Sequence, residues 1–294
     1  MKFNTLKLIT STPLTQKKKL KTVLRFFWWG IYSKTISQKK KYKFIGETDI
    51  TIIKGISTSE LQYYCGFSEF KDMGFLVHFL RKEDTFIDIG ANIGSYTLLA
   101  SSHMGAGTIA VEPVPITFTY LQENISINNI ESKVNPLNIG LSNQKSTLKF
   151  SALLDAVNHV ISDEEALTMP HVEVPVDTLD NISKDKHPIC IKIDVEGFET
   201  NVINGADSTL SNPSLQAIII ELNGSANQYG FDESLIHEKL LKYGFKPYDY
   251  NPLNRTFSAM NSYGKFNTIY LRDIEFARKR IESAPKQKVF GTTF

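Results

Sequence analysis

Apolar residues occur along the chain in two alternating patterns. Short runs rich in Ile and Val predict buried strands, and longer runs with apolar residues every three or four positions predict helices. The strand pattern is found at Thr85–Ile89, Thr108–Val111, Val134–Ile139, Ile189–Ile193, Gln216–Leu222 and Asn267–Leu271. The helix pattern is found at Gly94–His103, Ile116–Asn128, Phe198–Asn204 and Glu233–Tyr243. Strands that alternate with helices are typical of βαβ units, so we expect a doubly wound α/β sheet that is mostly parallel.

The segments that flank this alternation divide the chain into four predicted parts. They are a basic arm at 1–46, a small β and helical lead-in at 47–80, the main domain at 81–275 and a basic tail at 276–294. We expect 1–20 to be poorly ordered, Lys17–Trp29 to be a helix, Phe44–Ile56 a strand pair, Glu69–Leu80 a helix and Phe276–Phe294 a loose tail. Further β-type segments (LKFSALL, VEVPV) between Thr147 and Val176 predict an insertion at the carboxyl end of the sheet, where ligands bind in such folds.

Charge is distributed unevenly along the chain. The first 46 residues contain 12 of the 33 basic residues and none of the 31 acidic ones, so the remainder has 21 basic against 31 acidic residues. Such an arm suits an anionic partner, which is a membrane surface, a phosphorylated intermediate or nucleic acid, or it is a solvated tail. Its apolar residues Leu20, Val23, Leu24 and Phe27 fall at helical spacing. They fit a membrane anchor and docking on the protein's own body equally well.

Composition indicates an ordinary globular protein, with 41% hydrophobic and 22% charged residues. Phe26–Tyr32 is far shorter than the roughly 18 residues that a membrane span needs, and no secretory cleavage pattern follows it. The two cysteines, Cys65 and Cys190, are widely separated, which gives no sign of a metal knuckle or a disulfide framework. The expected location is the cytoplasm, with any membrane contact of the arm at the inner membrane surface.

A glycine-containing turn follows the first strand of the main domain. The segment TFIDIGANIGSY ends a strand, turns tightly between two glycines four positions apart, and opens a helix. Backbone N–H groups at such a helix start bind ligand oxygens. Dinucleotide sites use G-x-G-x-x-G, whereas this turn has G-x-x-x-G with an acid just before it, which suits an ammonium group better than a pyrophosphate. The cofactor-binding candidates here are Asp88, Gly90, Asn92, Gly94 and Tyr96.

The next two strands end in further candidates. Glu112 follows the second strand, where an acidic side chain is the usual acceptor for both hydroxyls of a ribose. Ser142 and Asn143 follow the third strand, in a position to hydrogen-bond an adenine edge or to form a plain turn.

Five motifs in this order resemble FkbM-type methyltransferases. They are DIGANIGSYTLLA, VEPVPITFTYLQENISIN, VPVDTLD, KIDVEGFE and IIIELNG, and the resemblance covers about 67–250. It implies a class I methyltransferase fold, with a Rossmann-like, seven-stranded sheet. It also implies S-adenosylmethionine as methyl donor and a hydroxyl acceptor, often on a sugar of a bacterial surface polysaccharide or on a polyketide. The arm lies outside the shared pattern.

The tip of the fourth strand holds the candidates for methyl transfer. A hydroxyl is a weak nucleophile, so a base or a metal must take or weaken its proton. In KIDVEGFE, strand alternation points Lys192, Asp194 and Glu196 to one side. Asp194 is the first choice for general base or metal ligand and Glu196 the second. Lys192 contacts substrate or neutralises these acids, and Glu199 complements a helix N-terminus or takes part in the site.

The fifth strand and the insertion add further candidates. Glu221 and Asn223, with Asp194, are expected to contact substrate or to hold a divalent metal such as Mg²⁺. His159 in the insertion is a possible base or a packing residue. The remaining histidines lack zinc-type spacing.

The function expected from these residues and from the resemblance is S-adenosylmethionine-dependent O-methylation of a hydroxyl, on a sugar of a surface polysaccharide, a glycolipid or a similar natural product. The alternatives are another acceptor, such as a polyketide or a nucleic acid, and an NAD-dependent oxidoreductase on a similar sheet. The missing G-x-G-x-x-G disfavours NAD, and the acidic body disfavours nucleic acid. The sequence leaves the acceptor and the oligomeric state open.

Overall fold

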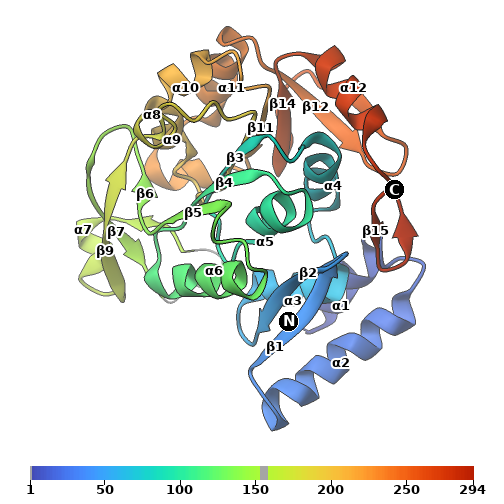
Figure 1. The fold of residues 1–294 in the computed structure, drawn as a ribbon. Helices are drawn as coiled ribbons and strands as arrows, with labels where there is room; N and C mark the ends of the chain where they lie inside the picture. Colours follow the sequence, from blue (N-terminus) through green and yellow to red (C-terminus); the bar gives the residue numbers. More distant parts are fainter. Residues whose placement is uncertain (1, 153–157) are drawn as a thin grey trace.

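A computed structural model describes residues 2–152 and 158–294 of the chain. Its centre is an eight-stranded sheet with helices on both faces (Figure 1). The strands lie in the order β13-β12-β14-β11-β10-β3-β4-β5. Their bounds are Thr256–Ala259 (β13), Lys246–Asn251 (β12), Asn267–Leu271 (β14), Ala217–Glu221 (β11), Cys190–Ile193 (β10), Thr85–Ile89 (β3), Gly107–Val111 (β4) and Val134–Leu137 (β5).

The five strands from β11 to β5 are parallel, and β14, β12 and β13 are antiparallel to their neighbours. The doubly wound, mostly parallel fold is therefore confirmed. The expected number of seven strands is wrong by one, because the short strand β13 adds to the edge beyond β12. Strands β12 and β13 form a hairpin, and its alternating polar sequence did not match the pattern expected for a buried strand.

The strands bury opposite side chains in two cores. Phe86 of β3 points to the core under α4 (Phe70–Phe79), α5 (Ser95–Thr97), the π-helix η1 (Leu98–His103), α6 (Pro115–Ile127) and α12 (Ile274–Ser283). Ile87 and Ile89 point to the core under α8 (Leu179–Ile182), α9 (Glu199–Asn204), α10 (Asp207–Ser211) and α11 (Glu233–Lys242). Because both faces are covered, the strands read as nearly continuous apolar runs.

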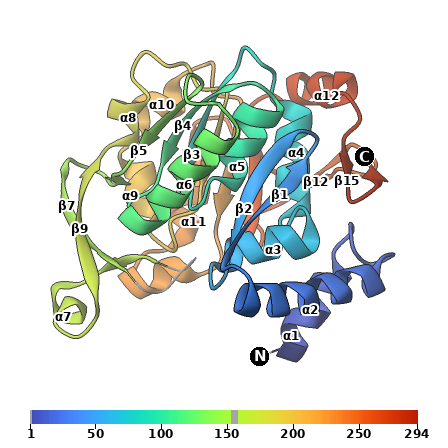
Figure 2. The same cartoon turned by 60° about the horizontal axis from the view of Figure 1, so that its bottom comes forward.

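The N-terminal 65 residues form a small unit beside the main sheet (Figure 2). It contains α1 (Lys2–Ser11), α2 (Lys19–Thr35), the hairpin β1 (Lys39–Ile45) and β2 (Thr48–Ile53), and α3 (Ser57–Cys65). The expected disorder of 1–20 is wrong, because α1 inserts Ile9 into a core with Trp29 and Tyr63. Among the described residues, no helix combines the length and apolarity that a membrane crossing needs.

The C-terminal segment is ordered, which corrects the expected loose tail. Residues 274–283 form α12, and β15 (Lys288–Val289) pairs with β16 (Thr292–Thr293). Arg280 forms a 2.6 Å ion pair with Asp84 at the start of β3, and Phe294 packs on Phe67 and Phe70. These contacts link residues that are far apart in sequence, so the local hydrophobic pattern could not predict them.

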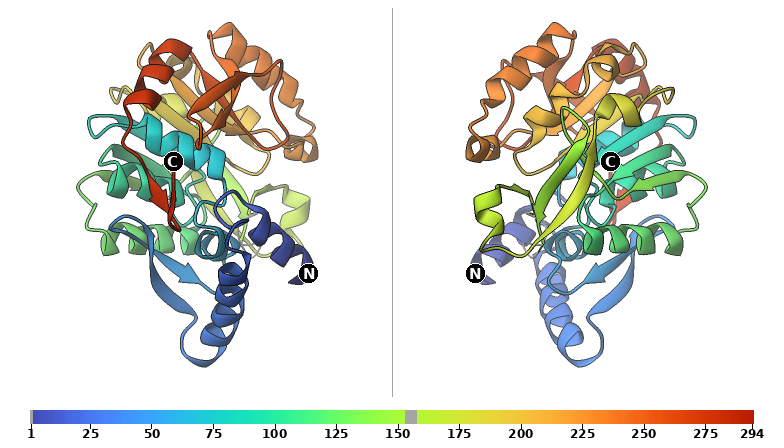
Figure 3. Two further views of the ribbon diagram at one scale, coloured as in Figure 1. Left: turned by 90° about the vertical axis from the view of Figure 1, so that its right-hand side faces the viewer. Right: turned by 90° about the vertical axis from the view of Figure 1, so that its left-hand side faces the viewer.

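The predicted insertion is a separate four-stranded sheet (Figure 3). It has the order β6-β9-β7-β8, with bounds Gly140–Leu141 (β6), His171–Asp177 (β9), Ser146–Ser151 (β7) and Val160–Ile161 (β8). The short helix α7 (Asp163–Ala166) lies between β8 and β9. Residues 153–157 of the predicted segment lie outside the described residues. Cys65 and Cys190 are buried free thiols.

Candidate functional site

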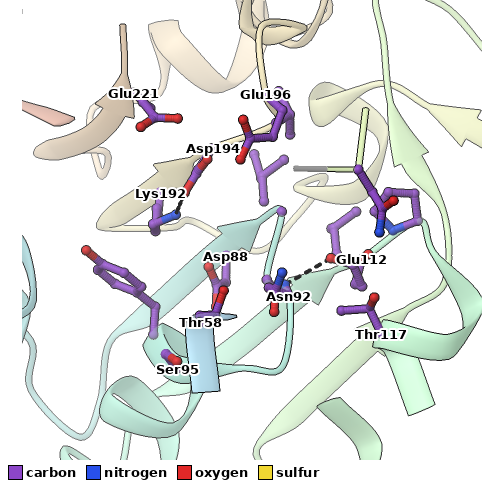
Figure 4. A pocket seen from close by; sticks show the side chains of 18 of the residues that line it. Thr58, Asp88, Asn92, Ser95, Glu112, Thr117, Lys192, Asp194, Glu196 and Glu221 are labelled. Carbon is purple, nitrogen blue, oxygen red and sulfur yellow. Dashed lines mark hydrogen bonds and ion pairs between the residues drawn. The ribbon is translucent and has the colours of Figure 1, made fainter. Parts of the chain in front are cut away.

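A cavity of about 330 Å³ lies at the carboxyl ends of β3, β4, β10 and β11 (Figure 4). This volume lies within the usual range for small-molecule and cofactor sites. Its floor is the turn after β3, and its other walls come from α3, the start of α6 and the inserted sheet. The location matches the general rule that open α/β sheets bind ligands beyond the carboxyl ends of their strands.

Gly90 allows two strand tips to approach each other closely. Its φ is +77°, and a Cβ atom there would lie 1.8 Å from the carbonyl oxygen of Asp194. Any side chain would therefore push the β3 turn away from the tip of β10. Gly94 has a φ of +93°, and a Cβ there would lie 2.6 Å from Leu121 Cδ1, so it permits the turn to pack on α6.

Asp88 is buried beneath this turn with one oxygen unsatisfied. Thr97 Oγ1 donates a 2.7 Å hydrogen bond to its Oδ2, whereas no donor among the described residues reaches the buried Oδ1. Burial raises the pKa of the Asp88 carboxyl, and Lys192 partly offsets this. A buried carboxylate oxygen without a donor is costly, so this atom fits a cationic group placed in the cavity.

Glu112 at the tip of β4 contacts the glycine-containing turn directly. Its two oxygens accept 2.9 Å hydrogen bonds from the backbone N–H groups of Asn92 and Val114. Burial raises its pKa to about 7, against the effect of these two donors. Each carboxylate oxygen has two lone pairs, so Glu112 retains capacity for two hydroxyl donors from the cavity.

Lys192 and Asp194 form an ion pair at the tip of β10. Lys192 Nζ lies 2.7 Å from Asp194 Oδ2, and it also lies 4.8 Å from the centre of the Tyr96 ring. Burial alone would lower the pKa of Lys192, but Asp194, Glu69 and Asp88 together raise it above its usual value. Lys192 is therefore held as a cation that neutralises part of the acidic wall.

Three carboxylates from two neighbouring strand tips lie together. One oxygen from each of Asp194, Glu196 and Glu221 lies within 4.8 Å of the others. Burial, followed by the charge of Asp194, raises the pKa of Glu196 to about 7 and that of Glu221 to about 8. Asn223 does not line the cavity, and its Oδ1 accepts hydrogen bonds from the backbone N–H and the hydroxyl of Ser225.

Glu199 supports the turn that carries Glu196. Its Oε1 accepts hydrogen bonds from the backbone N–H groups of Val195, at 2.9 Å, and Gly197, at 3.3 Å. Glu196 itself has a φ of +55°, a conformation that is rare for a residue with a side chain. The buried Glu199 carboxylate thus holds the unusual backbone that directs Glu196 toward Asp194.

Five predicted site residues do not line the cavity, and they are Gly94, Ser142, Asn143, His159 and Asn223. Gly94 lies under the turn against Leu121. Ser142 donates its N–H to the carbonyl of Asp177 and its hydroxyl to Asn143, while Gly140 and Leu141 provide the cavity wall instead. His159 lines a separate hollow with Glu164, Glu165 and Tyr229.

The lead-in and the insertion contribute lining residues that sequence reasoning missed. Glu69, at the start of α4, accepts hydrogen bonds from Tyr96 Oη and Asn267 Nδ2, at 2.8 and 2.9 Å. The remaining missed residues include Thr58, Leu61 and Gln62 of α3, and Phe150 and Val160 of the inserted sheet. A lone Glu before an apolar helix has no local signal for a site role, because only the tertiary fold brings it to Tyr96.

The described residues that line the cavity include six carboxylates and one ammonium group. The acids are Glu69, Asp88, Glu112, Asp194, Glu196 and Glu221, and the cation is Lys192. Such a wall attracts a cationic ligand and repels phosphate groups.

Comparisons with known proteins identify the family to which the chain belongs. Residues 88–247 match the model of the methyltransferase FkbM domain. The hexuronic acid methyltransferase AglP of Haloferax volcanii is 30% identical over 162 residues, which are 54% of this chain and 64% of AglP. Methyltransferase 1 of Beauveria bassiana is 26% identical over 180 residues, covering 53% of this chain and 72% of that protein.

A solved structure with the same family name is also similar. The crystal structure of methyltransferase FkbM from Methylobacillus flagellatus KT has a TM-score of 0.43 and 15% identity, covering 75% of this chain and 56% of that chain. The matched part is less than two thirds of that protein and of AglP. The family model, however, spans more than half of the chain and includes the tips of β3, β4, β10 and β11. The chain therefore belongs to the FkbM methyltransferase family.

Proposed function

We propose that this protein transfers a methyl group from S-adenosylmethionine to a hydroxyl of a sugar. The observation that carries the proposal is the acidic cavity, with the unsatisfied Asp88 Oδ1 at its floor. S-adenosylmethionine has a sulfonium and an ammonium group against one carboxylate, so its net charge complements this wall. NAD and nucleic acids bring phosphates, which the same wall repels.

The residues fit the two ends of this cofactor. Asp88 would place its negative charge beneath the ammonium group, and Glu112 would accept hydrogen bonds from the ribose hydroxyls while it continues to bind the turn. Gly140, Leu141, Phe150 and Val160 provide the apolar wall for an adenine ring. A cofactor bound there would supply an electrophilic methyl carbon, whose bond to sulfur breaks as the C–O bond forms, with a neutral sulfide as the leaving group.

The carboxylates at the tips of β10 and β11 act on the acceptor. A hydroxyl donates to Asp194 or Glu196, which orients its oxygen toward the methyl carbon and takes its proton as the C–O bond forms. The raised pKa of Glu196, about 7, suits a group that accepts a proton near neutral pH. Lys192 holds the Asp194 carboxylate in place through their 2.7 Å ion pair.

A divalent cation such as Mg²⁺ is the second candidate for activating the acceptor, because a bound cation lowers the pKa of a hydroxyl. Asp194, Glu196 and Glu221 present hard oxygen ligands close together, and Glu196 takes the place that the sequence suggested for Asn223. Metal binding needs these acids deprotonated, so it would lower the raised pKa values of Glu196 and Glu221.

A sugar acceptor is supported by the neighbouring carboxylates and by one relative. Carboxylates bind the paired hydroxyls of a polyol well, and AglP is described as a hexuronic acid methyltransferase. A polyketide hydroxyl remains the alternative acceptor. Mass spectrometry of glycans and lipids from cells with and without the protein separates the two, since we expect one added methyl group on a sugar.

Calorimetry with the purified protein tests the cofactor. We expect saturable binding of S-adenosylmethionine, none of NADH, and loss of binding in Glu112→Ala. Asp194→Asn should retain cofactor binding and lose methyl transfer. The absence of saturable binding by the wild type, with a normal melting transition, would overturn the proposal.

A further inference from the structure

The outer face of α2 exposes an apolar stripe. Its members are Leu20, Leu24, Phe27, Trp28 and Ile31, each between 51% and 73% exposed. At 3.6 residues per turn they fall within an arc of roughly 100° along one side of the helix. Five large apolar side chains on one exposed helix face form a contiguous patch, and such patches mark interaction surfaces.

The opposite face of α2 attaches the helix to the protein. Thr22, Trp29 and Ser33 are buried there, and Trp29 Nε1 donates a 2.8 Å hydrogen bond to Glu60 of α3. Arg25 donates to the carbonyl of Tyr63 at 3.0 Å. Docking on the protein's own body therefore accounts for the buried face of α2. It does not account for the exposed Leu20, Leu24 and Phe27 on the other face.

Lysines lie along both edges of the apolar stripe. On the same helical projection Lys34 lies next to Phe27, and Lys21 lies next to Trp28. Lys19, Lys21 and Lys34 are exposed, and none has an acidic partner within ion-pair distance among the described residues. This pattern allows the ammonium groups to reach lipid headgroups while the stripe enters the interface.

We propose that α2 lies in the plane of an anionic membrane and binds it through this stripe. Charge complementarity selects this partner, because α2 contains four basic residues and no acid, and its lysines form no ion pair among the described residues. A second copy of the chain would oppose lysines to lysines across the same patch, which disfavours self-association. Trp28 within the stripe matches the preference of tryptophan for the membrane interface.

The docked helix lies close to the cavity. α2 packs on α3, and Thr58, Leu61 and Gln62 of α3 line the cavity wall. Two helix layers, roughly 20 Å, thus separate the lipid from the site. If the proposed function holds, this arrangement favours a sugar carried on a membrane lipid as the methyl acceptor.

Cosedimentation of the full chain with vesicles tests the docking. Vesicles of phosphatidylcholine with about 30 mol% phosphatidylglycerol are compared with phosphatidylcholine alone. We expect binding to the anionic vesicles that is at least tenfold stronger and that falls with salt. The pair Leu24→Glu and Phe27→Glu should weaken it at least tenfold, and Lys19→Gln, Lys21→Gln and Lys34→Gln together should do so at low salt.

Leu241→Glu is the matched control, because Leu241 is an exposed leucine on α11, away from the arm. It should bind vesicles as the wild type does, and all variants should keep the wild-type melting transition. Retained binding in the Leu24→Glu, Phe27→Glu variant would overturn the proposal. The proposal would also be overturned if the wild type eluted as a dimer in gel filtration and the Leu24→Glu, Phe27→Glu variant eluted as a monomer. Cofactor calorimetry on the same variants stays unchanged, so this test is independent of the proposed function.

Discussion

The cavity and the N-terminal arm differ in the sign of their charge and in how closely their atoms are packed. The described residues of the cavity bring six carboxylates and one ammonium group into a space where a single Cβ atom at Gly90 would collide with backbone. The arm has only basic charge, and α2 keeps one face open to solvent. Because the two regions have opposite charges, the chain as a whole has a net charge of only +2. The difference teaches that the cavity depends on exact backbone position, whereas the outer face of α2 depends only on side-chain chemistry.

The largest effect is expected at Gly90. Gly90→Ala combines a left-handed backbone with a contact of 1.8 Å to the Asp194 carbonyl, and should lower the free energy of unfolding by about 2–5 kcal/mol. Gly244→Ala is the matched control, because its φ is +85° but no atom lies within 4 Å of the added Cβ. It should cost only about 1–2 kcal/mol. Urea denaturation measures both, and equal losses would refute the close contact.

The next effect concerns the buried charge of Asp88. Asp88→Asn keeps the shape and the acceptor for Thr97, but removes the charge that faces the proposed ammonium group. We expect affinity for S-adenosylmethionine to fall about a hundredfold, ~2.7 kcal/mol, by calorimetry. Glu83→Gln, on the exposed loop before β3, serves as the control and should bind normally. A change of less than threefold in Asp88→Asn would remove Asp88 from the cofactor site.

A smaller, pH-dependent effect is expected at Glu221. Its folded-state pKa is raised to about 8 by burial and by Asp194, above the ordinary value of 4.5. The folded protein therefore holds a proton that the unfolded chain releases, so Glu221 contributes a loss of stability as pH rises from about 4.5 to 8. Glu221→Gln removes this loss and should exceed the wild type by roughly 1 kcal/mol at pH 8, with no difference near pH 4.5.

Repeating the Glu221→Gln comparison with added Mg²⁺ tests whether the three carboxylates bind a metal. If the three carboxylates bind the ion, added Mg²⁺ should stabilise the wild type at pH 8 and leave Glu221→Gln unchanged. Glu238→Gln, an exposed change on α11, controls for general charge effects. Thermal melts at several pH values report both outcomes. A wild-type stability that rises relative to Glu221→Gln between pH 5 and 8 would contradict the raised pKa.

The cavity was easier to predict from sequence than the parts around it. The turn from Asp88 to Gly94 and the tips bearing Glu112 and Asp194 are local motifs at strand ends, and parallel strands bring their carboxyl ends to one edge. Glu69 was missed because only tertiary packing brings it to Tyr96. The tail at 276–294 was mispredicted for the same reason, since its order depends on contacts such as Arg280 with Asp84.

The arm offers the smallest effect and the clearest contrast with Gly90. Gly30 lies within α2, exposed, with no atom within 4 Å of an added Cβ. Gly30→Ala reduces the conformational freedom of the unfolded chain without crowding, and should raise the free energy of unfolding by about 0.5–1 kcal/mol. Urea denaturation followed by α2 tryptophan fluorescence detects it. Destabilisation by this change would mean that the outer face of α2 is packed against something, and the contrast between an open arm and a crowded cavity would fail.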